Sequence, residues 1–350
     1  MRSLACAVPL KEAEAARKWL AARHLIASGL ETRREPDRVL FPLTEDPGSL
    51  PYPVLEADFE VRTQRATSYA ELVQLPPDLH SLLPGGYDIV GDVVLVRLPD
   101  ELIDHRAPIG DALLRFVPGS RVVVLDRGVH GETRIRSLET IAGSGPLSTT
   151  HRENGLSFRV DLAQAYFSPR LAGEHERVAQ SGRDGEHLLD LFCGIGPFAL
   201  TFLVRHPRSA ATAVDLNVQA ISLARENARR LRVEERLTLA EEDVTGFLAH
   251  AGAFDRVVMN LPHEGYKYIT LVDPHVKSPG WLHFYGLVPR ERSRTTTTVP
   301  RLPDEGTAAE ALRSLVEPKG QAPKWTLKER REVHPYSPAL TLESFTLEKT

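Results

Sequence analysis

The sequence predicts an α/β protein in which a C-terminal parallel sheet, flanked by helices, follows two smaller α+β domains. From residue 187 onward, short apolar segments alternate with helical ones, which is typical of parallel strands joined by helical crossovers. Before residue 180, strand-like alternation of apolar and polar residues dominates and helices are few. A loop-like stretch at 44–53 and a polar one at 63–69 separate the N-terminal segments from the rest. We therefore expect three domains, at residues 1–66, 67–179 and 180–350.

The first domain is expected to be a small α+β unit, and the second to combine one helix with a mostly antiparallel sheet. In the first, we expect a strand at 4–8, a helix at about 10–25, and strands at 39–43 and 57–62. In the second, we expect strands at 87–98, 120–125, 132–141 and 156–162, and a helix at 110–117.

The third domain carries the parallel sheet. Its strands are expected at 187–192, 210–216, 237–242, 254–261 and 281–288. Strand-like segments at 325–333 and 339–347 are expected to close the chain as an antiparallel pair, and the polar stretch 289–306 is expected to be a surface loop. Parallel strands followed by such a hairpin are the layout of a Rossmann-like class I methyltransferase domain.

Composition and charge narrow the class of protein. No apolar run is long enough to span a membrane, and residues 1–26 carry charges where a signal peptide would be apolar. The two cysteines, Cys6 and Cys193, form neither a disulfide framework nor a zinc-ligand spacing, so we expect a cytoplasmic protein without a metal ion. A net charge of -4 argues against a protein that coats nucleic acid over its whole surface, but it permits a local basic face.

A glycine-rich turn follows the first strand of the predicted parallel sheet. The segment 190–198, DLFCGIGPF, places Gly194 and Gly196 where the backbone can approach a ligand at the carboxyl edge of the sheet. Pro197 stands where the helix opens and there is no third glycine, so the turn suits a packed methionine moiety better than a dinucleotide pyrophosphate.

Acidic residues end three successive strands of this sheet: Asp190, Asp215 and Asp243. Asp215 can accept hydrogen bonds from both ribose hydroxyls, and Asp243 or the next backbone N–H can meet an adenine edge. Three carboxylates suit a positively charged sulfonium donor and oppose a phosphate. The same residues would equally serve as helix N-caps and turn residues, which is the usual role of aspartates at strand ends.

The fourth parallel strand runs into Asn260-Leu261-Pro262-His263. This corner resembles the Asn-Pro-Pro-aromatic motif of amino-methylating enzymes, in which the asparagine and a backbone carbonyl hold an exocyclic amino group. The aromatic residue is absent here, so a different nucleophile is implied. Ring N1 of guanine carries a proton near neutral pH, and a carboxylate or histidine has to remove it before N1 can attack a methyl group.

Further motifs occur in a fixed order along the chain. They are YDIVGD at 87–92, GETRIR at 131–136, and YFSPRL at 166–171 followed by Glu174. Together with the glycine turn and the Asn-Leu-Pro corner, they resemble the archaeal and eukaryotic family of tRNA guanosine-37 N1-methyltransferases. The resemblance covers about residues 85–262, and it breaks at 263–267, where the family usually has small and apolar residues.

The resemblance implies a role for individual residues. It implies that Glu174 is the general base for the N1 proton and that Arg134, or alternatively Arg136, stabilises the charge on guanine O6. It also implies that Asn260 and Pro262 hold the base edge. The methyl donor, S-adenosyl-methionine, is expected against His175, Asp190, Phe192, Gly194, Gly196, Asp215, Leu216, Asp243, Val244 and Asn260. The residues expected to contact RNA are Tyr166, Arg170, Arg290 and Arg292.

Other functions are compatible with part of this pattern. A related enzyme of the wybutosine pathway transfers the aminocarboxypropyl arm of the same donor to tRNA. An rRNA or amino-group methyltransferase fits the corner sequence poorly, and a noncatalytic tRNA-binding protein would carry the donor fold as a vestige. By family likeness we expect the N-terminal domain to contact a remote part of the tRNA, and we expect a monomer.

Overall fold

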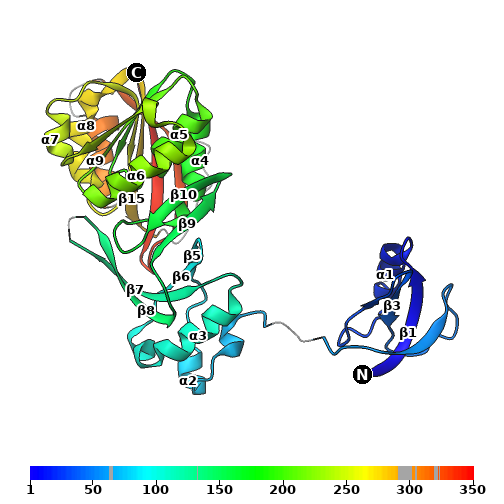
Figure 1. Cartoon of the computed structure of the whole chain (residues 1–350). Helices are drawn as coiled ribbons and strands as arrows, with labels where there is room; N and C mark the ends of the chain where they lie inside the picture. Colours follow the sequence, from blue (N-terminus) through cyan, green and yellow to red (C-terminus); the bar gives the residue numbers. More distant parts are fainter. Residues whose placement is uncertain (63–65, 132, 291–301, 304–305, 319–321, 323) are drawn as a thin grey trace. The chain divides into compact units, whose positions relative to one another are not determined.

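The computed structural model describes residues 1–62, 66–131, 133–290, 302–303, 306–318, 322 and 324–350. The described residues form two compact units, Met1–Glu71 and Leu72–Thr350, and each is presented by itself (Figure 1). The division into domains at 66–67 and 179–180 stays a prediction. Most of the expected loop at 289–306 lies outside the described residues.

The first unit is a small sheet with a helix packed on it. Its elements are β1 (Arg2–Pro9), α1 (Ala13–Ala21), β2 (Arg33–Arg34), β3 (Arg38–Pro42) and β4 (Val54–Asp58). The strand order is β2-β3-β1-β4, and β1 is antiparallel to both neighbours. Ala16 and Leu20 on α1 pack with Cys6 and Val8 on β1, so the helical and the strand periodicities bury one common core.

The turn η1 (Tyr69–Leu72) spans the boundary between the two units, and the second unit continues with α2 (Pro77–His80), followed by a mixed sheet. Its strands are β5 (Asp88–Val90), β6 (Val93–Val96), β7 (Val122–His130) and β8 (Ile135–Gly143), and η2 (Asp100–His105) and α3 (Arg106–Phe116) connect β6 to the parallel strand β7. The single strand expected at 87–98 is interrupted at Gly91, which has φ +58° and packs so closely on Thr149 that a Cβ would not fit.

A hairpin and a helix lead from this mixed sheet to the parallel one. They are β9 (Ser148–Glu153), β10 (Leu156–Asp161), η3 (Pro169–Leu171) and α4 (Ala172–Ser181). The buried side chain of Asn227 accepts from the backbone N–H of Arg159 at 2.6 Å and donates to its carbonyl at 3.0 Å. This pair of hydrogen bonds holds β10 against the helix that carries Asn227.

The large sheet has the strand order β13-β12-β11-β14-β15-β17-β16 (Figure 1). Its strands are β11 (His187–Leu191), β12 (Ala210–Asp215), β13 (Leu237–Glu241), β14 (Phe254–Met259), β15 (Val276–Pro289), β16 (Trp325–Pro335) and β17 (Leu340–Lys349). Strands β11 to β15 run parallel to their neighbours among themselves, whereas β17 is antiparallel to β15 and β16. The predicted α/β layout, with its closing hairpin, is confirmed.

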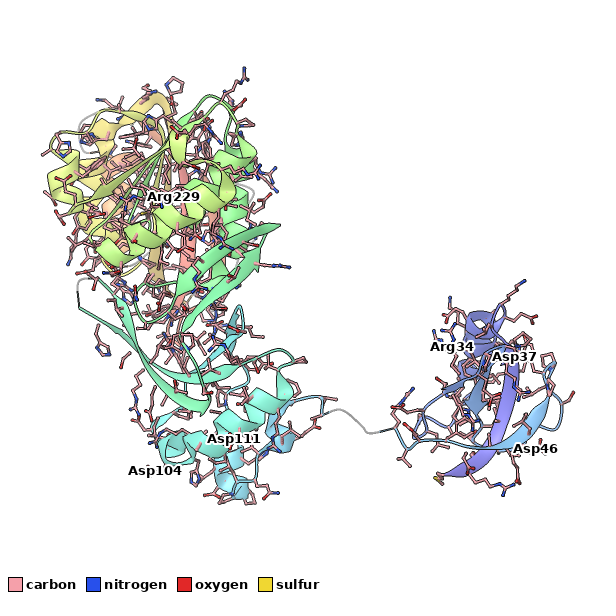
Figure 2. The ribbon with its side chains drawn as sticks, in the orientation of Figure 1. Arg34, Asp37, Asp46, Asp104, Asp111 and Arg229 are labelled. Carbon is pink, nitrogen blue, oxygen red and sulfur yellow. The ribbon has the colours of Figure 1, made fainter. Side chains whose placement is uncertain are left out.

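Helices cover both faces of this sheet. They are α5 (Pro197–Arg205), α6 (Val218–Leu231), α7 (Val244–Leu248), α8 (Ile269–Val272) and α9 (Thr307–Val316), with short turns η4 (Glu234–Arg236), η5 (Gly265–Tyr268) and η6 (Asp273–His275). Adjacent residues of β11 enter different cores: Leu188 packs with α5 and α6, and Leu189 packs with α7 and α8. Charged residues such as Arg229 lie on the outer face of α6 (Figure 2).

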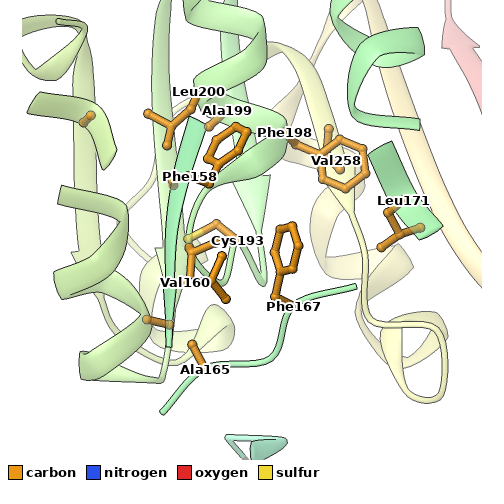
Figure 3. Close-up of a cluster of buried hydrophobic side chains, with 14 of the residues drawn as sticks. Phe158, Val160, Ala165, Phe167, Leu171, Cys193, Phe198, Ala199, Leu200 and Val258 are labelled. Carbon is orange, nitrogen blue, oxygen red and sulfur yellow. The ribbon is translucent and has the colours of Figure 1, made fainter. Parts of the chain in front are cut away.

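One of these cores reaches the predicted functional segments. Phe158 and Val160 of β10 pack in the same cluster as Cys193 and Phe198, which flank the glycine turn, and as Phe167 of the YFSPRL segment (Figure 3). Apolar packing thereby fixes the position of the two motifs relative to each other.

Candidate active site

The predicted glycine turn joins β11 to α5. Gly194 and Gly196 have φ of +56° and +84°, and a Cβ on Gly196 would lie 3.2 Å from the Leu200 side chain. The Gly194 N–H donates to Oδ2 of Asp215 at 2.7 Å and so ties the turn to the end of β12. Pro197 begins α5. The backbone therefore lies at the carboxyl edge of the sheet in the geometry expected of a binding crevice.

A cavity of about 490 Å³ opens at this edge. It joins the glycine turn to the Asn-Leu-Pro corner after β14 and to the turn between β7 and β8. The predicted residues that line it are Arg134, Tyr166, His175, Phe192, Gly194, Asp215, Leu216, Asp243, Val244, Asn260 and Pro262. Residues expected to hold the donor and residues expected to act on the base thus share one cavity.

Other predicted residues are not in the lining of this cavity. Arg170 instead donates from Nε to Oδ1 of Asp88 at 2.7 Å. Arg290 lies exposed just after β15, and Arg292 lies outside the described residues. Gly196, Asp190 and Glu174 are buried in the fold.

The acidic strand ends have different environments. Asp190 is 0% exposed, and burial raises its pKa to about 8. Within the described part of the chain, its Oδ1 has no hydrogen-bond partner, while Oδ2 accepts from the Ala199 N–H at 3.2 Å. Burial also raises the pKa of Asp215, although backbone N–H groups, including that of Gly194, oppose the shift. Asp243 is the N-cap of α7, since its side chain accepts hydrogen bonds from backbone N–H groups of that helix. This is the ordinary role of a strand-end aspartate that the sequence also allowed.

Glu174 lies on α4 and is 3% exposed. Its Oε2 accepts from Tyr285 Oη at 2.8 Å and from Arg177 Nη2 at 2.8 Å. Burial favours the neutral carboxyl, but the Arg177 guanidinium outweighs it and holds the pKa of Glu174 below its ordinary value. The side chain is therefore ionised at neutral pH and sheltered from bulk solvent, next to the cavity-lining residues Leu171 and His175 of the same segment.

His175 faces the cavity in a fixed orientation. Its Nδ1 lies 2.7 Å from Oε1 of Glu153, and its ring packs edge-on against Phe198 with the centroids 4.5 Å apart. Sequence reasoning missed Glu153, because a glutamate near a hairpin turn carries no local sign that it pairs with a distant histidine.

The Asn-Leu-Pro corner presents an unsatisfied acceptor. Oδ1 of Asn260 is buried and has no hydrogen-bond partner among the residues that the structure describes. His263, the next residue after the corner, lies with Nε2 2.8 Å from Tyr336 Oη, and their rings are 5.2 Å apart at 74°. Burial and the nearby Arg134 lower the pKa of His263, so its imidazole is neutral at neutral pH. Tyr336 was not predicted, since it comes from the loop between β16 and β17.

The two candidate arginines of the β7–β8 hairpin differ in their surroundings. Arg134 lines the cavity, with φ +52°. Arg136 is buried in an ion pair with Asp126, donates to the Phe167 carbonyl at 3.2 Å, and lies 4.6 Å above the Tyr166 ring. Arg134 is thus the hairpin arginine that a base in the cavity can reach.

Two absences hold for the part of the chain that the structure describes. It contains no group of three or more His, Cys, Asp or Glu side chains placed to bind a metal ion. It contains no helix with the length and apolarity that a membrane span requires.

The chain is similar in sequence and fold to known proteins. The profile of the TRM5/TYW2 methyltransferase domain matches residues 149–310, and that of the TYW2 N-terminal domain matches residues 70–146. The tRNA (guanine(37)-N(1))-methyltransferase Trm5b of Pyrococcus abyssi is 32% identical over 82% of this chain and 85% of its own length. An aminocarboxypropyltransferase of Pyrococcus horikoshii that acts on 4-demethylwyosine 37 of tRNA(Phe) is 29% identical over 62% of this chain and 77% of its own. The crystal structure of Trm5b from Pyrococcus abyssi superposes with a TM-score of 0.75 at 29% identity, over 99% of both chains.

Proposed function

The chain belongs to the TRM5/TYW2 methyltransferase family, and from this premise we propose that it methylates N1 of guanosine 37 in tRNA with S-adenosyl-methionine as donor. The observation that carries the proposal is the shared cavity: the glycine turn and the Asn-Leu-Pro corner face the same space of about 490 Å³. A donor held at the turn and a purine held at the corner would lie side by side.

The residues at the turn fit the donor. Asp215 lies at the end of β12, where a carboxylate can accept from ribose hydroxyls, and Phe192 and Val244 offer apolar surface for an adenine ring. Near the end of β11, next to the turn, Asp190 leaves one buried oxygen without a partner within the described residues. When bound, the donor supplies an electrophilic methyl group.

The corner fits a guanine edge. Oδ1 of Asn260 lacks a hydrogen-bond partner among the described residues, and a purine N–H would satisfy it. Arg134 lines the same cavity and is proposed to stabilise the negative charge that develops on O6 as the N1 proton leaves.

Glu174 is proposed to take that proton. Arg177 keeps its carboxylate ionised, which is the state that a base requires. Since both Arg177 and Tyr285 already contact the carboxylate, proton transfer requires one of these hydrogen bonds to be exchanged for the guanine N1–H.

The proposed function is tested by incubating an unmodified tRNA transcript with enzyme and donor and identifying the nucleosides by mass spectrometry. N1-methylguanosine from a transcript with guanosine 37, and no methylated guanosine from one with adenosine at that position, is expected. The second candidate function, which the match to the TYW2 N-terminal domain supports, is tested on tRNA that carries 4-demethylwyosine at position 37. A product with the aminocarboxypropyl arm on that tRNA would favour it. No product together with no donor binding would favour a noncatalytic tRNA-binding protein.

We also propose that the chain acts as a cytoplasmic monomer and that its N-terminal unit, Met1–Glu71, contacts a part of the tRNA remote from the anticodon loop.

A further inference from the structure

A second cavity, of about 180 Å³, adjoins the one that holds the proposed reaction. The two cavities share a wall, whose residues line both: Arg97, Tyr166, Ser168, His334 and Tyr336. Its size lies below the usual range for sites that enclose a whole small molecule, and it suits a single planar ring or a phosphate.

The shared wall presents two aromatic rings. Tyr166 is 37% exposed and Tyr336 is 39% exposed, which is unusual for large rings in the lining of a buried site. Both rings are held by a neighbouring side chain: Arg136 lies 4.6 Å from the centroid of the Tyr166 ring, and His263 Nε2 lies 2.8 Å from Tyr336 Oη. Rings that are exposed and already oriented lose little entropy when a flat ligand stacks on them.

The second cavity is also lined by three arginines and two aspartates, so cations are in surplus. Arg97 and Arg136 both contact Asp126, and Arg170 pairs with Asp88. Arg136 is buried, and its Nε has no hydrogen-bond partner within the described part of the chain. A buried guanidinium N–H without a partner is costly, so this group points to an acceptor supplied by a ligand.

We propose that this second cavity is a subsite for the nucleotide adjacent to the methylated guanosine. Its base would stack on the rings of Tyr166 and Tyr336, and its base edge or phosphate would accept hydrogen bonds from the arginines. The inference rests on the proposed function, because it requires an RNA substrate. Stacking on aromatic side chains and charge-assisted contacts from arginine are the means by which proteins hold unpaired nucleotides. A nucleotide is favoured over a free metabolite because the wall is shared: whatever enters the second cavity lies next to the guanosine in the first.

The experiment combines substrate and protein changes. Single-turnover methylation is measured on a tRNA transcript that is intact or carries an abasic residue on the 5′ or on the 3′ side of the target guanosine. For one of the two abasic transcripts, we expect the ratio of the single-turnover rate constant to the dissociation constant to fall about 5- to 150-fold. This is the range that follows from removing one base–aromatic stack. Tyr336→Leu should impose a similar loss on the intact transcript and little further loss on that abasic one. Tyr336→Phe, which keeps the ring, should keep the sensitivity to the missing base.

Several results would overturn the subsite. One is equal methylation of the intact and both abasic transcripts, and another is a Tyr336→Leu loss that persists undiminished on the abasic RNA. Titration with S-adenosyl-methionine checks that the leucine variant is folded, and Tyr166→Leu provides a second variant if it is not. If wild-type enzyme methylates no transcript, the proposed function fails, and the subsite is then judged by RNA binding: fluorescence anisotropy must still show weaker binding of one abasic transcript.

Discussion

Nδ1 of His175 lies 2.7 Å from Oε1 of Glu153, and both side chains are buried. With the Glu153 oxygen as acceptor, Nδ1 is the donor of this hydrogen bond, and Nε2 is the ring nitrogen left to meet a ligand in the cavity. On the other side of Glu153, His151 Nε2 lies 3.7 Å from Oε2. Glu153 is thus the positioning residue of a histidine in the donor cavity.

Glu153→Ala is expected to weaken S-adenosyl-methionine binding. Removing the carboxylate leaves the buried His175 without its acceptor, which costs about 1–3 kcal/mol, or roughly 5- to 150-fold in the dissociation constant. Isothermal titration measures this loss, and Glu153→Gln, which retains an acceptor oxygen, should recover part of it. The exposed Glu226 of α6 gives a matched control, as Glu226→Ala should bind the donor normally. Normal donor binding by the Glu153→Ala variant would show that Glu153 does not position His175 for the donor.

Asp215→Ala is expected to weaken donor binding as well. The carboxylate is proposed to accept from ribose hydroxyls, and hydrogen bonds to a charged group contribute about 1.5–3 kcal/mol. Isothermal titration measures the effect. Because Asp215 also accepts a hydrogen bond from the Gly194 N–H, a thermal melt checks that the variant remains folded. If affinity were unchanged, the ribose assignment would be wrong.

The elevated pKa of Asp190, about 8, predicts a pH-dependent stability. Because the folded carboxyl stays protonated to a higher pH than the unfolded one, folding becomes less favourable as pH rises from about 4 to about 8 and levels off above that. Asp190→Asn removes this titration, so its free energy of unfolding should rise relative to wild type across that window. Urea titrations at several pH values test this, and a constant difference between the two proteins would contradict the buried protonated state.

Asn227→Ala is expected to lower the free energy of unfolding by about 2–4 kcal/mol, because it leaves buried backbone groups of β10 without partners. The two hydrogen bonds to Arg159 hold that strand on α6. Urea denaturation measures the change. Gln219, an exposed residue of the same helix α6, gives a control whose alanine variant should unfold nearly as wild type. A loss below about 0.5 kcal/mol, the range of ordinary surface changes, would show that β10 does not depend on this contact.

Local patterns in the sequence could predict the parts of the site that are continuous in the chain. The glycine turn at Gly194 and Gly196 was predictable because the φ angles it needs are those that glycine favours. Residue pairs that come together only in the folded chain could not be predicted in this way. Tyr336 lies 73 residues from His263, and Glu153 lies 22 residues from His175, and neither separation leaves a periodic signal. The expected single strand at 87–98 was wrong for a different reason, since Gly91-Asp92 forms a two-residue turn between the paired strands β5 and β6.

Single-turnover formation of N1-methylguanosine at position 37 by wild type and by Glu174→Gln, each saturated with donor, tests the central claim most directly. Loss of a general base is expected to slow the reaction by about 10²- to 10⁴-fold while donor binding stays close to normal. Glu176→Gln, two positions further along α4, serves as control and should react like wild type. A Glu174→Gln rate close to that of wild type would contradict the account.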